Sequence, residues 1–544
     1  MKTKTVFLLA PLLACPLAAQ DNATSQLMTY GTTAGGTVDV FLSGVTPDST
    51  TYILADTGLD LNNNTFLQTN FGTGDSQDTL SITGGPTFAA ILSGTSTPSG
   101  TFPLNGLSLP GTLPHGFEVF WQGFTQHPTP GVDFFQDFSN YRRQVIHDGV
   151  QWQDTATLPS VAVANLAWAV KETGLNGRAT KVFVCGGGPA LLTEDTVPYP
   201  TSVTTWEYDV ATEEHRAMDD MLESRAFHTV TRLNDGRLLV CGGVTGPFGG
   251  PPPAQYFTKV LNSAEIWQEG VGFSSVGPMN GYRAGHTATL IESGPNAGMV
   301  LIAGGVEGDV NHELFGVDEI LSTGVNSTEL FDPATGNFIA GPNLPEPKAG
   351  ARALWLQNDT LAVIGGVTWR QIGPFKLPDF SDMATFLDPN TMVFGNTRNL
   401  LAKRALFGMV ELPNGNLVLA GGAGGDILNI GPIADAELFA LAGQQFISLP
   451  PMPGAVAFNG IAATPTSQVV VAGGAGGTIF DPVPVKSVYQ LDALGTAWTT
   501  LADLPVEQGG GVTELLEDGN LLVSCGETGV ADTATNSTVK LPVQ

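Results

Sequence analysis

A short apolar run that ends in a pair of glycines returns seven times along this chain, every 52 to 62 residues. The runs are Val182–Gly187, Leu238–Gly243, Val300–Gly305, Leu361–Gly366, Leu417–Gly422, Val469–Gly474 and Leu521–Gly526. Six of them end in Gly-Gly, and the seventh continues as Cys525-Gly526-Glu527. A fixed period of this size is typical of a repeat architecture. It constrains the shape of the protein far more than its chemistry.

Each repeat contains the pattern of four β-strands, and the unit that begins near Arg283 shows it clearly. The expected strands are His286–Ile291, Met299–Ala303, Ser327–Phe331 and a fourth through Phe338. The turn Asp332–Gly336 separates the last two, because Asp-Pro presets φ and glycine accepts a left-handed conformation. In other repeats a tight-hairpin signal such as Asn234-Asp-Gly236 separates the first two. A recurring four-stranded sheet whose second strand is a continuous apolar run predicts the blades of a β-propeller.

The repeat resembles that of the kelch family. The matching residues are Arg283-Ala-Gly-His286, Gly304-Gly305, Glu329-Leu-Phe-Asp332 and Phe338. The chain is equally similar to the central propeller of galactose-oxidase-like proteins. The resemblance covers residues 148–544 and implies an all-β protein with a kelch-type propeller in residues 146–544. It implies little about function, since this fold hosts many unrelated activities.

The way in which the ring closes follows from the two ends of the repeat region. The last repeat stops at Lys540-Leu541, after its third strand. The segment Val150–Leu158 looks like a fourth strand, and it is similar to Ala497–Leu504. We therefore expect residues 150–158 to complete the last blade, which leaves no sheet edge exposed. This closure predicts seven blades.

Residues 1–145 lack the repeat. Residues 1–19 have the basic start, apolar stretch and small-residue exit of a secretory signal peptide, and lipid anchoring at Cys15 is an alternative. Residues 20–145 predict a small β-sandwich, either a carbohydrate-binding or adhesive module or a structural spacer. Its expected strands are Thr37–Val45, Thr51–Ala55, Thr79–Thr83, Phe88–Leu92 and Phe117–Phe124. We expect a secreted, periplasmic or cell-surface protein without a transmembrane segment.

Charge and residue content exclude several classes of function. A formal charge of −29 argues against nucleic-acid binding, which needs a cationic surface. Cys185, Cys241 and Cys525 share one repeat position that elsewhere holds Ala or Ile, which predicts buried thiols. The resemblance to copper-radical oxidases, which use this propeller, would imply a copper site with a Tyr-His pair. In this sequence no Tyr is followed by His, so the copper site is not expected here. No other catalytic motif is present, so we expect no cofactor, no metal and no identifiable enzymatic activity.

Cationic residues recur at the start of the first strand of several repeats. They are Arg225, His228, Arg283, His286 and Arg404, with Lys348 in the intervening repeat. This position should ring one mouth of the central channel. Two interpretations stay open. The side chains either bond to loop backbone between blades, as kelch arginines often do, or form a patch for an acidic ligand, as in kelch proteins that bind acidic peptides or sialic acid.

Long loops between the second and third strands should open on the same face in the first four repeats. They span 188–202, 244–262, 306–326 and 367–382, and the corresponding loops of the fifth and sixth repeats are shorter. They carry Tyr256, His312, Trp369 and Arg370. Aromatic residues beside arginine suit the recognition of a sugar or a peptide. The sequence thus predicts a monomeric binding protein for a glycan or an extracellular protein. The alternative is a metal-free carbohydrate-active enzyme such as a kelch-type sugar mutarotase.

Overall fold

The computed structural model describes short segments of the N-terminal part of the chain and most of the repeat region. The described residues are 7–9, 26–30, 37–43, 50–56, 89–95, 101–108, 117–126, 135–136, 142–146, 152–155, 164–174, 177–192, 198–250, 254–315, 322–372, 375–425, 430–478, 481–529 and 533–543. Every secondary-structure element in them is a β-strand, and the prediction of an all-β fold is confirmed. No helix in these residues is long and apolar enough to span a membrane. Cys15 and the predicted strand Thr79–Thr83 lie outside the described residues.

The N-terminal strands form two antiparallel sheets. The first contains β2 (Gln26–Tyr30), β3 (Thr37–Ser43) and β6 (Thr101–Ser108). The second contains β1 (Phe7–Leu9), β5 (Ala89–Thr95), β4 (Thr50–Asp56), β7 (Phe117–Gln126), β8 (Phe135–Gln136) and β9 (Arg142–Ile146). Strands β3, β4, β5 and β7 lie where the sequence predicts them, whereas β2 and β6 were not predicted. Strand β1 lies within the predicted signal peptide and pairs with β5.

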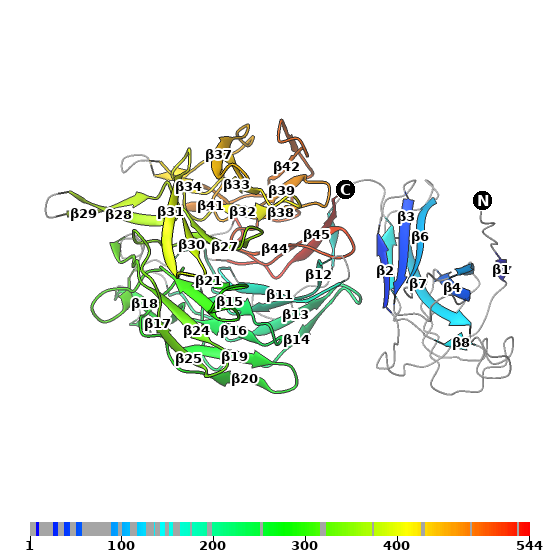
Figure 1. The fold of residues 1–544 in the computed structure, drawn as a ribbon, viewed down its shortest axis with the longest axis horizontal. Coiled ribbons are helices and arrows are strands. Elements are labelled where there is room, and N and C mark those ends of the chain that lie inside the picture. Colours follow the sequence, from blue (N-terminus) through cyan, green and yellow to red (C-terminus); the bar gives the residue numbers. More distant parts are fainter. Residues whose placement is uncertain are drawn as a thin grey trace.

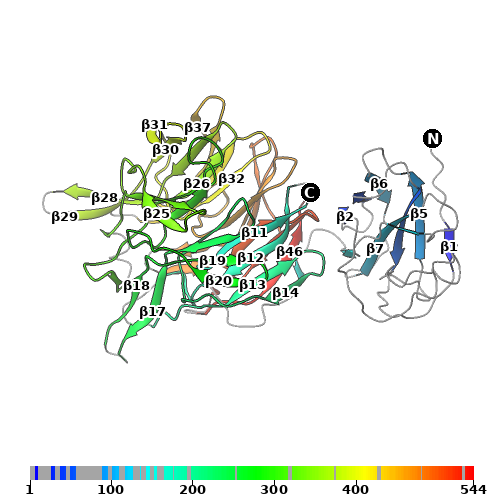
Figure 2. The same ribbon diagram turned by 60° about the horizontal axis from the view of Figure 1, so that its bottom comes forward.

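From residue 153 onward, the described part of the chain contains seven four-stranded antiparallel sheets, here numbered 1 to 7. Sheets 1 to 3 are β11 (Ala167–Thr173), β12 (Ala179–Cys185), β13 (Thr205–Asp209), β14 (Glu214–Ala217); β15 (Thr229–Arg232), β16 (Leu238–Cys241), β19 (Ala264–Gln268), β20 (Gly272–Ser275); and β21 (Thr287–Leu290), β22 (Val300–Ala303), β24 (Thr328–Asp332), β25 (Asn337–Ala340). Sheets 4 and 5 are β26 (Arg352–Leu356), β27 (Thr360–Ile364), β30 (Met383–Asp388), β31 (Val393–Asn399); and β32 (Gly408–Glu411), β33 (Leu417–Ala420), β36 (Ala436–Ala440), β37 (Gln445–Ser448). Sheets 6 and 7 are β38 (Gly460–Ala463), β39 (Val469–Ala472), β42 (Val488–Leu491), β43 (Trp498–Thr500); and β44 (Val512–Leu515), β45 (Asn520–Ser524), β46 (Thr538–Pro542), β10 (Gln153–Asp154). In Figures 1 and 2 they lie around a common centre, apart from the N-terminal strands.

The second strand of each sheet is apolar because it is covered on both faces. All four residues are buried in β16, β22, β33 and β39. The core therefore consists of layers between neighbouring sheets. In one such layer Leu239 of sheet 2 packs with Ile302 and Phe331 of sheet 3. A strand packed on both sides cannot alternate polar and apolar residues, which explains the continuous apolar runs in the sequence.

Sheet 7 is completed by a strand from the start of the repeat region. Strand β10 pairs with β46 in antiparallel register, with Gln153 opposite Lys540. Next to it, the backbone nitrogen of Thr155 donates to the carbonyl of Thr538 at 3.0 Å. The indole of Trp152 donates to the carbonyl of Ala502 at 2.8 Å. The outer strand of the last sheet thus precedes the first sheet in the sequence.

A closed ring of backbone hydrogen bonds joins the seven sheets just before their first strands. One residue from each connection donates its N–H to the carbonyl of the equivalent residue in the preceding sheet, at 2.8 to 3.2 Å. In ring order these residues are Asn165, Phe227, Gly285, Gly350, Leu406, Phe458 and Gly510, and the N–H of Asn165 donates to Gly510 to close the circle. All seven have a positive φ, between 50° and 67°. The left-handed conformation directs each N–H and carbonyl along the ring. Glycine adopts it without strain, and other residues adopt it only where their surroundings stabilise it.

Candidate functional site

The glycine pairs hold neighbouring sheets together through the backbone. The N–H of Gly187, at the end of β12, donates to the carbonyl of Arg225 in the next sheet at 2.7 Å. Gly243 makes the same bond to Arg283. A Cβ atom on Gly243 would lie 2.5 Å from the carbonyl oxygen of Ala226, and its φ is +94°. The repeat therefore needs glycine here both for close backbone approach and for the left-handed conformation.

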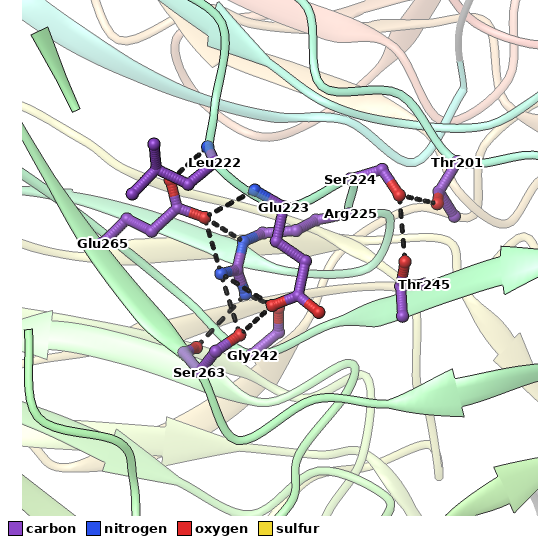
Figure 3. A network of polar contacts seen from close by, with 9 residues as sticks. All are labelled: Thr201, Leu222, Glu223, Ser224, Arg225, Gly242, Thr245, Ser263 and Glu265. Carbon is purple, nitrogen blue, oxygen red and sulfur yellow. Dashed lines mark hydrogen bonds and ion pairs between the residues drawn. The ribbon is translucent and has the colours of Figure 1, made fainter. Parts of the chain in front are cut away.

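Arg225 lies inside sheet 2, with no exposed surface, and its guanidinium is fully engaged by the protein (Figure 3). It donates to the carbonyl of Gly242 at 2.9 Å, to the hydroxyl of Ser263 at 2.9 Å and to the carboxylate of Glu265 at 2.8 Å. Glu265 also accepts the N–H of Leu222 at 2.7 Å. The ion pair thus fixes the connection before the first strand against the second and third strands of the same sheet.

The equivalent cations in sheets 3, 4 and 5 make the same contacts. Arg283 donates to the carbonyl of Gly304 and to Glu329, both at 3.0 Å. Arg404 donates to the carbonyl of Gly421 at 3.0 Å and to Glu437 at 2.6 Å. Lys348 donates to the carbonyl of Gly365 at 3.0 Å. These contacts agree with the first interpretation of the cations, bonding to loop backbone, but the side-chain bonds lie within one sheet. The links to the preceding sheet are made by the backbone of these residues: the N–H of Arg283 donates to the carbonyl of Leu261, and its carbonyl accepts from Gly243.

His228 and His286 are buried between sheets, beside cysteine thiols. The Nε2 atom of His228 lies 3.3 Å from Sγ of Cys185, and that of His286 lies 3.0 Å from the hydroxyl of Thr229 and 3.6 Å from Sγ of Cys241. Burial lowers the pKa of His286 to about 3 and raises the pKa of Cys241 to about 11. Both groups are therefore neutral at physiological pH, unlike the thiolate and imidazolium of a catalytic pair.

All three cysteines in the repeats are buried and free, as the sequence predicts. Their shared position in the repeat is a small core position next to the glycine pair. In the described part of the chain, no group of three or more His, Cys, Asp or Glu side chains could hold a metal ion.

Two of the long connections between second and third strands, those of sheets 2 and 4, contain β-ribbons rather than irregular loops. In sheet 2 the ribbon is β17 (Val244–Gly249) with β18 (Tyr256–Val260), and β23 (Glu313–Leu314) from sheet 3 adds a third strand. In sheet 4 it is β28 (Val367–Ile372) with β29 (Phe375–Phe380). Sheets 5 and 6 have only short pairs, β34 (Ala423–Gly424) with β35 (Gly431–Pro432) and β40 (Ala475–Gly477) with β41 (Pro482–Pro484). Figures 1 and 2 show the long ribbons projecting from the same side of the ring.

An aromatic cluster covers the ribbon of sheet 2. The rings of Phe248 and Phe257 are stacked with centroids 5.6 Å apart, and Phe315 packs on Phe257 at 5.2 Å. The ammonium group of Lys259 lies 5.4 Å from the centre of the Phe248 ring. Phe248 is 39% exposed. These four residues, which we call the aromatic cluster, expose part of the Phe248 ring beside the Lys259 cation on the ribbon.

A second aromatic contact lies beside this ribbon. The ring of His312 stacks on Tyr282 with centroids 3.6 Å apart and an angle of 9° between the planes. His312 has a φ of +60°, and its Nδ1 atom lies 3.1 Å from the carbonyl of Glu307. Tyr282 was not predicted as a site residue. The signal for it in the sequence is that an aromatic residue precedes Arg283 where Ser224 precedes Arg225.

The structure separates the nine predicted site residues into two groups. Arg225, His228, Arg283, His286 and Arg404 are buried in or between the sheets. Tyr256, His312, Trp369 and Arg370 belong to the ribbons or to the connections that support them. Trp369 and Arg370 lie on β28, opposite Pro378 and Leu377 of β29. An ion pair of 2.7 Å between Lys403 and Asp379 ties this second ribbon to the connection before sheet 5.

Comparison with known proteins gives similarities to solved structures alone. No protein-family model matches the sequence, and no curated protein matches it either. Among solved structures, the chain is similar to the one titled "Structure of YjhT", with 14% sequence identity and a TM-score of 0.43 over 64% of this chain and 99% of that chain. At this level the similarity carries no conclusion about activity.

Proposed function

We propose that this protein is an exported binding protein that uses the face bearing the long ribbons to hold a glycan or an extracellular protein. Its support is a seven-bladed kelch-type propeller made of sheets 1 to 7 and closed by residues 150–158. A small sandwich in residues 20–145 precedes it. The seven sheets of equal topology, the strand β10 that completes sheet 7 and the closed ring of backbone bonds support this architecture.

The observation that carries the proposal is the exposed aromatic cluster on the ribbon of sheet 2. An aromatic face can stack on the apolar face of a sugar ring or receive an apolar side chain of a partner. The three-stranded support fixes the rings before binding, which reduces the entropy that association costs. The ribbons of sheets 5 and 6 are much shorter than those of sheets 2 and 4. The ribbons therefore extend furthest from the ring at sheets 2 and 4, and we place the binding surface there.

The buried cations take no part in this surface. Arg225, Arg283 and Arg404 each have a carboxylate partner within their own sheet and less than 3% exposure. A ligand of this face therefore need not be acidic. The cations available to it are those of the ribbons, such as Lys259 beside Phe248.

The location outside the cytoplasm is part of the proposal, and residues 1–19 support it by their composition. We propose a monomer that acts without a cofactor. The culture medium, the cell-surface fraction and the cytoplasm of the native cells can be compared with an antibody against the repeat region. A protein found only in the cytoplasm would contradict this part of the proposal.

The binding surface is tested with a glycan array and with pull-down from the medium of the native culture. For any ligand found, Phe248→Ala and Trp369→Ala should weaken binding by at least about tenfold, the usual effect of removing an aromatic anchor. The melting temperature should stay within a few degrees, because both residues lie on ribbons outside the sheets. Val271→Ala is the matched control, since Val271 is 69% exposed in the turn between β19 and β20. Unchanged binding in both ribbon variants would move the site elsewhere.

A further inference from the structure

A cavity of about 570 Å³ lies among the first strands of sheets 1, 4, 5, 6 and 7. It extends from Asn459 and Gly511, next to the backbone ring, to the turn Gly177–Ala179 at the far end of β11. Apolar side chains such as Leu354 and Ile461 form much of its wall. A volume of this size is typical of sites that hold a small molecule. None of the ribbon residues lines it, so it is separate from the face proposed above.

Arg352 is the exception among the cations of the ring. It lies at the start of β26, lines the cavity and is exposed to it. Its Nε atom donates to the carbonyl of Phe407 at 2.8 Å. No carboxylate of the described residues pairs with it, and both Nη groups lack a protein partner there. Burial among the surrounding strands lowers the pKa of its guanidinium.

Other buried cations of the same ring are neutralised. Arg225, Arg283, Arg404, Lys348 and Lys540 each form an ion pair of 2.6 to 3.0 Å with a carboxylate. Arg352 instead faces the cavity with both Nη groups free of a partner among the described residues, so its charge is available to an anion bound there. In a chain with a net charge of −29, an arginine that faces a cavity without a carboxylate partner of its own is therefore a specific feature. The planar Nη edge matches the two oxygens of a carboxylate.

Carboxyl groups lie elsewhere on the cavity wall. Glu514 is on β44 of sheet 7, which is three sheets away from Arg352 around the ring. Burial raises the pKa of Glu514 to about 7, an effect that the nearby charge of Arg178 reduces. Burial and the charge of Glu292 also raise the pKa of Glu411. With a pKa of about 7, the Glu514 carboxyl can either donate a hydrogen bond to a ligand hydroxyl or accept one near neutral pH.

We propose that this cavity binds a small hydroxy acid, with the ligand carboxylate on the Nη edge of Arg352 and a ligand hydroxyl on Glu514 or Glu411. The apolar wall between them accommodates the carbon chain. Sheets 4 and 7 supply the two ends of the site, so the intact ring is required for it. The inner strand of sheet 4 thereby gains a role that none of the other repeats shares.

Calorimetric titration of the full chain with lactate, malate, gluconate and sorbitol tests the proposal. At least one of the three acids should bind, and sorbitol, which has the hydroxyls of gluconate without its carboxylate, should not. Arg352→Gln should weaken binding of that acid by about tenfold or more, the loss expected for a charge-assisted pair. Arg352→Lys should recover part of the affinity, because it keeps the charge without the planar edge.

Arg232→Gln is the matched control, since Arg232 ends β15 on an exposed position outside the cavity lining. The acid that binds should also raise the melting temperature of the wild type and of Arg232→Gln but not that of Arg352→Gln. The proposal is overturned if none of the three acids binds, if sorbitol binds as well as gluconate, or if Arg352→Gln binds as tightly as the wild type.

Discussion

Sheets 3 and 6 fill the same positions with different chemistry. In sheet 3, Arg283 before the first strand forms a buried ion pair with Glu329 on the third strand. In sheet 6 the equivalent residues are Val456 and Tyr489, both less than 9% exposed. The backbone bond to the preceding glycine pair is the same in both, at 2.7 Å to Arg283 and 2.8 Å to Val456. The backbone link therefore belongs to the fold, whereas the ion pair is one of two ways to fill the space around it.

A similar exchange of side chains occurs three residues further along the connection. His286 of sheet 3 packs beside Cys241, while Phe407 of sheet 5 occupies the equivalent position, one residue after its ring residue Leu406. Both side chains are less than 6% exposed. A polar ring that hydrogen-bonds to a neighbouring hydroxyl and an apolar ring thus serve the same packing purpose. The two kinds of sheet should differ in how they respond to mutation and to pH.

The largest effect should come from breaking the ion pair of sheet 3 on one side. Glu329→Ala leaves the guanidinium of Arg283 buried without a counter-charge, and it removes the acceptor for the N–H groups of Asn280 and Gly281. We expect a loss of roughly 3 to 5 kcal/mol in the free energy of unfolding, measured by urea denaturation. Glu214→Ala, at an exposed position of β14, should change it by less than about 0.5 kcal/mol. A loss below about 1 kcal/mol for Glu329→Ala would show that the pair is not essential to sheet 3.

A smaller effect should appear as a dependence on pH. The pKa of His286 is about 3 in the folded protein, below its ordinary value of 6.5, so the unfolded chain binds a proton that the folded protein does not. The contribution to stability is complete above pH 6.5 and is lost as the pH falls from 6.5 toward 3. His286→Phe, which copies sheet 5, should remove on the order of 1 to 2 kcal/mol of the stability loss between pH 7 and pH 5. Urea unfolding of both proteins at both pH values measures it. If His286→Phe loses as much stability between pH 7 and pH 5 as the wild type does, the histidine is not neutral and buried.

The smallest effect should come from converting sheet 3 to the chemistry of sheet 6. Arg283→Val combined with Glu329→Tyr removes both charges and restores apolar packing. The double variant should lose less than about 2 kcal/mol relative to the wild type, since exchanging a buried ion pair for packed apolar groups is often nearly neutral. If it is as unstable as Glu329→Ala alone, the sheets are not interchangeable, and the pair has a role beyond filling space.

Much of the repeat region could be predicted because its signals are local. The unit near Arg283 predicts strands at His286–Ile291 and Met299–Ala303, and the structure has them at Thr287–Leu290 and Val300–Ala303. The glycine pair and the apolar run of a strand buried on both faces can be recognised within each repeat, without knowledge of the rest of the chain. The N-terminal strands β2 and β6 were not predicted, because short threonine- and glycine-containing segments have no such period.

The candidate sites were harder to predict because they depend on where side chains point. Arg225 and Arg352 are both arginines near a first strand, yet one is enclosed with Glu265 and the other faces the cavity. Arg225 precedes its ring residue Phe227 by two positions and Arg352 follows its ring residue Gly350 by two, and only the folded ring reveals the consequence of this difference. Two of the long connections predicted as loops contain ribbons; in one of them Val244–Gly249 pairs with Tyr256–Val260 once the sheet positions their ends.

The ring of backbone bonds has a consequence for the order in which the protein folds. Trp152 and Ala502, which meet at the closure, are 350 positions apart. During synthesis the first sheet emerges long before its neighbour on the closing side, so each completed sheet can add to the previous one while both ends of the array stay open. The final step joins parts of the chain that are far apart in sequence, and such long-range contacts form slowly. A nascent chain therefore carries unpaired strand edges until the last sheet leaves the ribosome, and it is most exposed to aggregation just before the circle closes.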